Sequence, residues 1–361
     1  AHTQSSGIYT NWTYQLSEQW DTSLGVRYTS VDYESTVFGA IPGFGELNTE
    51  GKQNFSDPSY SFKLRYYPLP DTLVYVGVDT AFRSGGVNVL APLAGQLANV
   101  FTQSPVSENL RTISEDYAEF TQEDSVAYEI GLKGTFLEQR LRWNVAAFFQ
   151  TYDDHQYRTS PSDTAVTSVL AGPLSNLAVN VEELELYGFE TEVDYLITEH
   201  WSLAAIAAYS KPEIQEYSKR MCIDGEAAGG QLVCPGEAGE PLNEEPLFHL
   251  FSQLRFTYPI AATDWEFFGL FAAEYFDKPY QAVRTPNIED ILVFDLTLGI
   301  QDAGGEWTLK LWSRNITDET VIEGEQQALA VSGPGTGTEV LGYSANVRAP
   351  RSLGVTAEYR F

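Results

Sequence analysis

The two cysteines are the first residues whose type and spacing could do chemistry. Cys222 and Cys234 lie in one glycine-rich, acidic segment, with eleven residues between them. Such a close pair indicates a disulfide formed in an oxidising compartment. A metal site would need further ligands near by, and no histidine lies between the two cysteines. We therefore expect a disulfide that closes this segment.

The other reactive residues form no catalytic motif. The histidines are far apart and lack the two-histidine helical spacing of a zinc site. They are His2, His155, His200 and His249. Segment 333–339, GPGTGTE, has the glycines of a phosphate loop without a strand before it and a helix after it. Asp153 and Asp154 could bind a cation, although paired acids near a strand end are usually solvated. With no Gly-x-Ser-x-Gly turn present, the sequence predicts no enzyme, no metal site and no cofactor.

Composition narrows the class of protein. The formal charge of −29 over 361 residues argues against a nucleic-acid partner, because nucleic acids bind basic surfaces. The acidic residues gather in segment 213–245, which reads as one long solvated loop. No run of about 18 apolar residues occurs, so a transmembrane helix is excluded. A membrane β-barrel stays possible, because only every second strand residue needs to face lipid.

Along much of the sequence, apolar and polar residues alternate with a period of two. This alternation is typical of β-strands with one apolar face. In the last strand, Leu353, Val355, Ala357, Tyr359 and Phe361 share one face, and polar residues share the other. Thirteen segments of this kind are predicted, each long enough to cross a bilayer at a tilt. They lie near 6–17, 20–36, 56–68, 72–84, 124–137, 140–156, 176–197, 201–215, 246–259, 264–278, 291–301, 306–320 and 344–361.

Short and long connections alternate along the chain. The short ones read SEQW, LPDT, LEQR, TEHW, AATDW and DAGGEW, which suit tight hairpins. The long ones span about 37–55, 85–123, 157–175, 216–245, 279–290 and 321–343. This alternation is typical of transmembrane barrels with short periplasmic turns and long extracellular loops. Trp201, Trp265, Tyr14 and Phe136 stand beside short turns, where an interfacial aromatic girdle is expected.

Several segments resemble TonB-dependent outer-membrane receptors, in the order that this family uses. The last strand, RSLGVTAEYRF, ends in Phe361 and resembles the terminal strand by which outer-membrane proteins are recognised for assembly. The other matching segments are TLVYVGVDTAFRSGGVNV (72–89), EDSVAYEIGLKGTFLEQRLRWNVAAFFQTYDDHQ (123–156), VEELELYGFETEVDYLITEHWSLAAIAAYS (181–210) and LKLWSRNITDETV (309–321). The matches fall within residues 72–361, with a weaker echo at 6–36.

The resemblance also defines what is missing. Family members carry an amino-terminal plug domain and a TonB-contacting box, inside a barrel of about 22 strands. This sequence shows neither feature, and an odd number of strands leaves two edges open. We therefore expect residues 1–361 to be the carboxyl-terminal part of a receptor barrel, without the plug domain and the first barrel strands. Pairing of the first and thirteenth strands into a closed ring would contradict this.

By resemblance, the function is import of a scarce, bulky nutrient across the bacterial outer membrane, most often a ferric siderophore. The resemblance implies the TonB–ExbB–ExbD system as partner, acting through the plug. Outer-membrane lipid and lipopolysaccharide would surround the barrel. Extracellular loops and lumen side chains would bind the ligand, and inward-facing basic residues would line a path for anionic chelates. The basic residues that could face inward are Arg27, Lys63, Arg65, Arg83, Lys133, Arg142 and Arg255.

Three alternatives stay open. A passive channel of about 14 strands would conduct ions without a plug. A surface adhesin or structural barrel would use the acidic loop with its disulfide as the working part. A soluble β-sandwich would be extracted without detergent. The ligand itself is not encoded in any transferable motif.

Overall fold

Thirteen strands in one antiparallel sheet make up most of the chain, which confirms the fold class expected from the alternation. The computed structural model describes residues 2–41, 45–88, 91–98, 105–159, 177–217, 220–221, 233–234, 238–239, 247–277, 290–330 and 339–360. The strands of the sheet are β1 (His2–Gln15), β2 (Trp20–Ile41), β3 (Gly45–Leu69), β4 (Thr72–Arg83), β7 (Glu123–Phe136), β8 (Leu141–Thr159), β9 (Leu177–Leu196), β10 (Trp201–Glu216), β13 (Phe248–Pro259), β14 (Trp265–Phe276), β15 (Ile291–Asp302), β16 (Trp307–Arg314) and β19 (Ser352–Tyr359).

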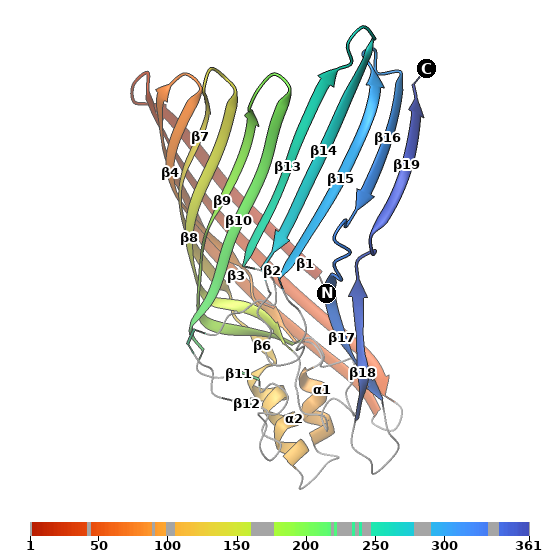
Figure 1. Ribbon diagram of the computed structural model, residues 1–361. Helices are drawn as coiled ribbons and strands as arrows, with labels where there is room; N and C mark the ends of the chain where they lie inside the picture. The colour runs from red at the N-terminus through yellow and green to blue at the C-terminus, as the bar shows by residue number, and fades with distance from the viewer. Residues whose placement is uncertain are drawn as a thin grey trace.

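Each strand pairs with its neighbours along the chain, and the sheet is open. Its order runs from β1 to β19 without a crossover, so β1 pairs only with β2 and β19 only with β16. Figure 1 shows the tilted strands curling, with the first strands drawn behind the last. As predicted, the first and thirteenth strands of the sheet do not close a ring.

Short and long connections lie at opposite ends of the sheet. All six predicted short turns lie at one end, which we call the short-turn end, and the opposite end is the loop end (Figure 1). The loop end holds α1 (Ala91–Ala98), α2 (Pro105–Asp116) and the small pairs β5 (Gly86–Val87) with β6 (Glu119–Phe120), β11 (Arg220–Met221) with β12 (Val233–Cys234), and β17 (Ile322–Ala330) with β18 (Glu339–Val347). None of the helices in the described residues is long and apolar enough to cross a membrane.

Four predicted loops contain more regular structure than the sequence indicated, and two of them, 216–245 and 321–343, hold the small strands β11, β12 and β17 and the start of β18. The connection expected at 37–55 is largely strand, because β2 and β3 stay paired as far as Ile41 and Gly45. The connection at 85–123 holds both helices, which bury the small side chains of Ala91, Ala94 and Ala98 against Leu110 and Ile113. Strand pairing beyond the membrane and a local apolar core therefore order segments that the sequence marked only as long connections between strands.

The two faces of the sheet differ in polarity. Ladder partners share a face, and one face is largely apolar, with Ile130, Leu311 and Val355 each more than half exposed. In the membrane-crossing part of the sheet this is the outer face, because the opposite set lines two hollows on the concave side. Such exposure is costly in water and favourable in lipid, where an outward apolar band is required.

Tryptophans mark the short-turn end of the outer face. Trp20, Trp201, Trp265 and Trp307 each begin a strand just after a short turn. Trp20 stacks on Tyr66, with ring centroids 4.4 Å apart, and Trp201 donates a hydrogen bond from Nε1 to the Tyr258 hydroxyl at 2.8 Å. Rings with one apolar side and one hydrogen-bonding group suit the boundary between lipid and water. The predicted girdle is therefore present at this end.

Two adjacent alanines test the assignment of faces. Ala207 lies on the outer face opposite Leu250 and Thr191, whereas Ala208 lies on the inner face opposite His249 and Glu190. We expect Ala207→Arg to destabilise the folded protein in lipid by roughly 2–4 kcal/mol, because it places a charge in hydrocarbon. Ala208→Arg should cost much less, since the inner face is wet and offers a carboxylate.

The measurement is denaturant unfolding of the intact protein in lipid vesicles, with the heat-modifiable gel mobility of the protein as the readout. Equal destabilisation by the two arginines would contradict the assignment of faces.

Candidate functional site: the inner wall and the loop end

The basic residues singled out from the sequence all lie on the inner face. Lys63 is opposite Gly77 and Arg65 is opposite Tyr75, which is itself opposite Gly131 on the next strand. The same register places Lys133 opposite Asn144, next to Arg142 on the ladder. The full set on this face is Arg27, Lys63, Arg65, Arg83, Lys133, Arg142 and Arg255. The structure therefore brings them onto one wall, spread over six strands.

Carboxylates on neighbouring strands neutralise part of this wall. The Arg65 guanidinium contacts Asp21 at 2.5 Å and also donates to the Ser23 hydroxyl. Arg142 contacts Asp194 at 2.5 Å and Glu192 at 3.3 Å. Cross-strand pairs of opposite charge stabilise the sheet modestly and fix the direction of long side chains. Of the seven basic residues, Lys63, Arg65 and Arg142 therefore have carboxylate partners in the described part of the chain.

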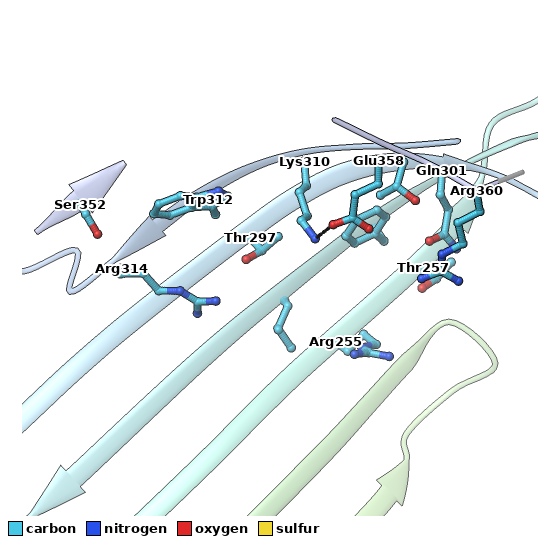
Figure 2. Close-up of a pocket in the computed structure, with 13 residues that line it drawn as sticks. Arg255, Thr257, Thr297, Gln301, Lys310, Trp312, Arg314, Ser352, Glu358 and Arg360 are labelled. Atoms are coloured by element: carbon cyan, nitrogen blue, oxygen red, sulfur yellow. Dashed lines mark hydrogen bonds and ion pairs between the residues drawn. The ribbon is translucent and has the colours of Figure 1, made fainter. Parts of the chain in front are cut away.

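A hollow of about 620 Å³ lies along the inner wall beside β16, from Thr308 near the short-turn end to Arg314 at the other end of that strand. Figure 2 shows its lining side chains rising from five strands, β13 to β16 and β19, toward a common space. Four cations line it, Arg255, Lys310, Arg314 and Arg360, and Glu358 is the one carboxylate among the lining residues. A second hollow of about 400 Å³ lies beside it over β8 to β10 and β13, and Arg255 lines both.

Sequence reasoning missed three of these cations. Lys310 and Arg314 share the inner face of β16, and Arg360 lies two residues beyond Glu358 on the β19 side. The signal that could have found them was the alternation in TLKLWSR, where every second residue from Thr308 is polar or aromatic. From the sequence, this alternation predicted only a strand and not the inward direction of these cations.

The segment that joins β4 to β7 is held to the sheet by side-chain amides at its base, which we call the neck. Gln156 donates from Nε2 to the carbonyls of Arg83, Ser84 and Thr121, at 2.9–3.3 Å. Asn180 accepts from Thr121 N–H and donates to the Asp154 carbonyl. One glutamine on β8 therefore ties together the two ends of the segment that carries both helices.

A second amide extends the neck toward β9. Asn88 donates from Nδ2 to the carbonyls of Tyr117 and Ala178, and its Oδ1 accepts from Ala178 N–H. Between these contacts, Gly85 leaves no room for a side chain, because an added Cβ would meet the Thr121 carbonyl carbon at 2.7 Å. This close approach gives a physical reason for glycine in the Arg-Ser-Gly-Gly segment.

A buried carboxylate completes the neck. Glu123 accepts a 2.6 Å hydrogen bond from Gln156 N–H, and its Oε2 lies 3.1 Å from His155 Nδ1. Burial tends to raise the pKa of Glu123, but His155 and the Gln156 amide outweigh it and hold the pKa below its usual range. Residue 123 lies beyond the stretch of about 11 residues, counted from Phe136, that crosses the bilayer. The ionised form of Glu123 therefore accepts the Gln156 N–H at the base of this segment.

The segment RNITD builds a second anchored base at the loop end. Asp295 accepts from the Arg314 guanidinium at 2.7 Å and from Asn315 N–H at 2.9 Å. Asn315, at φ 50°, bonds both backbone groups of Glu319, and Asp318 accepts from Arg351 N–H. These contacts bracket the β17–β18 hairpin between β16 and β19. They explain why arginine, asparagine and aspartate occur together there.

The other candidate residues named from the sequence lie away from the basic residues of the inner wall. Asp153 is on the outer face opposite Asp124 and Glu183, and burial followed by nearby carboxylates raises the pKa of Asp154. No group of three or more metal-binding side chains converges within the described ranges. Three predictions fall at least partly outside those ranges: the Cys222–Cys234 disulfide, segment 333–339 and Phe361. The backbone of Cys234 in β12 pairs with Arg220, two residues from Cys222.

Known proteins share this architecture. PiuA of Acinetobacter baumannii, described as a probable TonB-dependent siderophore receptor, is 22 % identical over 219 residues, covering 61 % of this chain and 25 % of that protein. Its crystal structure superposes with a TM-score of 0.64 at 18 % identity, over 98 % of this chain and 42 % of PiuA. The ferric yersiniabactin uptake receptor FyuA of Yersinia pestis gives 0.64 at 15 % identity, over 99 % and 46 % of the two chains.

A solved structure with a different cargo is also similar. The copper transporter OprC gives a TM-score of 0.63 at 14 % identity, over 99 % of this chain and 48 % of OprC. The matched stretch thus covers a quarter of the PiuA sequence, and the chain spans less than half of each of these solved structures.

The pattern of the family described as TonB dependent receptor-like, beta-barrel, matches residues 1–316. This match covers most of the chain, and the open antiparallel sheet with its lipid-facing outer surface agrees with it. The chain therefore belongs to the TonB-dependent receptor β-barrel family of the bacterial outer membrane.

Proposed function

We propose that this chain is part of a receptor that imports an iron chelate, a ferric siderophore or a similar compound, across the outer membrane. The observation that carries the proposal is the inner wall, where basic side chains from six strands face one lumen. Ferric siderophores are bulky and often anionic, and the basic side chains of the wall that carboxylates such as Asp21 and Asp194 do not neutralise offer such a cargo its partners. The likeness to PiuA and FyuA supports this class of cargo.

Residues 1–361 supply, in this proposal, the carboxyl-terminal thirteen strands of a barrel of about 22. The open edges of β1 and β19 support it, because unpaired backbone groups in hydrocarbon cost several kcal/mol each. The plug domain and the first strands then belong to the rest of the receptor. The plug provides the contact with TonB, which ExbB and ExbD energise.

The loop end is the ligand-receiving side of the receptor. In outer-membrane barrels the long connections face the outside and the short turns face the periplasm. The neck holds α1 and α2 at this opening, and the RNITD segment holds the β17–β18 hairpin there. The Cys222–Cys234 disulfide stiffens a third connection there, and lipid with lipopolysaccharide covers the outer face. No covalent chemistry is assigned to any residue.

Uptake that depends on TonB tests the function. Cells that express the intact receptor should accumulate iron-55 from at least one member of a panel of ferric siderophores, and accumulation should fall to background in a strain without TonB. The control is the same strain carrying the empty vector. Uptake independent of TonB, or a steady open-channel conductance in planar bilayers, would instead support a passive channel.

Gln156 tests whether the neck matters for ligand reception. Gln156→Ala removes the two N–H donors that the three carbonyls share, each worth about 1 kcal/mol, so local opening of segment 84–122 should become roughly tenfold or more frequent. Limited proteolysis of the receptor on intact cells should cleave this segment correspondingly faster, and siderophore binding should weaken.

The matched control is Gln150→Ala, on the same strand and the same face but nearer the membrane. An unchanged cleavage rate in Gln156→Ala would show that the amide does not hold the neck.

A further inference from the structure

Strands β8 and β9 continue beyond their neighbours as a two-stranded ribbon. The pairing of β8 with β7 ends at Asp153, whereas the pairing of β8 with β9 runs on. We call this continuation, residues 155–159 and 177–181, the arm. A two-stranded ribbon by itself is only marginally stable in water, yet Val179 and Val181 of the arm are 5 % and 0 % exposed. The arm is therefore packed against other parts of the protein.

On β8, the alternation of faces breaks just after Asp153, which is on the outer face. Continued alternation would place His155 on the outer face as well. Its Nδ1 instead lies 3.1 Å from Glu123 Oε2, and Glu123 is on the inner face, opposite Arg83. The strand is therefore rotated toward the lumen between Asp153 and His155.

Strand β9 is rotated in the same way. Glu183 is on the outer face, so Val181 would face outward if the strand stayed regular. Val181 is instead buried in an apolar cluster with Leu184 and Ile214, which are ladder partners on the inner face. The arm thus leans over the opening of the sheet. Figure 1 shows the loop ends of β8 and β9 turning across this opening, toward β6.

Asp154 is the residue at which β8 turns. Its φ is 54°, in the left-handed region, which aspartate adopts more readily than most residues. The Asn180 amide donates to the Asp154 carbonyl at 2.6 Å and supports this conformation. An extended residue at position 154 would restore the alternation of faces and direct the arm away from the lumen. One backbone rotation therefore separates a covering arm from an upright arm.

Three hydrogen bonds, which we call the latch bonds, join the arm to the segment between β4 and β7 and to the first residue of β7. In each of them a backbone N–H donates to a side chain of the other part. They are Ala178 N–H to Asn88 Oδ1 at 2.9 Å, Thr121 N–H to Asn180 Oδ1 at 2.7 Å and Gln156 N–H to Glu123 Oε2 at 2.6 Å. The ladder between the two strands of the arm is separate from these bonds. Rotation of the arm would break the latch bonds and leave the ladder intact.

We propose that the arm is a cover over the mouth at the loop end, that Asp154 is its hinge and that the latch bonds hold it closed. Rotation of Asp154 from the left-handed to the extended region swings the arm outward and opens the mouth to an incoming molecule. This inference goes beyond the proposed import function, because the movement belongs to the receptor with or without cargo.

Hydrogen exchange at single-residue resolution, on the intact receptor in lipid nanodiscs without cargo, tests the hinge. Asp154→Val disfavours the left-handed region, so the three latch N–H groups should exchange roughly tenfold faster. The N–H groups of Tyr157 and Val179, which are opposite each other on the ladder of the arm, should keep their rates. Asp154→Asn keeps the left-handed preference, so it should leave the latch rates unchanged.

The matched control is Asp153→Val, because Asp153 is the neighbouring aspartate and lies in the regular ladder. This variant should leave the latch rates unchanged. Two results would overturn the hinge. One is an unchanged latch rate in Asp154→Val, and the other is equal acceleration of latch and ladder N–H groups, which would show that the arm unfolds instead of turning. A receptor that fails to import iron chelates would leave the exchange result unaffected, so the two proposals fail separately.

Discussion

Backbone hydrogen bonding in hydrocarbon is the constraint on which the rest of this structure depends. Lipid offers no partner for a peptide N–H or carbonyl, so each strand in the membrane must be paired on both sides. Antiparallel pairing in chain order satisfies this for every interior strand of the sheet. The same pairing fixes which residues face outward, because successive side chains point to opposite faces. The apolar outer face, the polar inner wall and the open edges at β1 and β19 all follow from it.

The register of the strands determines which charged side chains meet on the inner wall. Cations and carboxylates that are far apart in sequence, such as Arg65 and Asp21 or Arg142 and Asp194, meet because their strands are adjacent. Part of the charge on the wall is paired in this way, and the charged side chains without such a partner are those available to a ligand. At the loop end, backbone pairing between neighbouring strands stops. There the chain leaves the ladder, and side-chain amides such as Gln156, Asn180 and Asn315 satisfy the backbone groups that pairing no longer reaches.

The sequence predicted the fold well because period-two alternation is a local signal. The thirteen strands, the short turns and the tryptophans beside them could all be placed from short windows. The inward direction of Arg255 and its companions followed from the same parity. Other features could not be placed, because they depend on contacts across long separations. Gln156 binds carbonyls 35 to 73 residues away, and the helices near 91–116 depend on the burial of residues such as Ala94 and Ile113 against each other, which no short window shows. The hollow combines β13 with β19, so neither strand alone reveals it.

The central claim is that the chain crosses the outer membrane as strands with one lipid face and one aqueous face. Spin labels placed one at a time at residues 203–208 of β10 in the intact receptor test it most directly. The accessibility of the labels to oxygen and to a water-soluble nickel complex should alternate with period two. Positions 203, 205 and 207 should be exposed to oxygen, and 204, 206 and 208 should be exposed to nickel. Uniform accessibility to nickel along the segment would contradict the account.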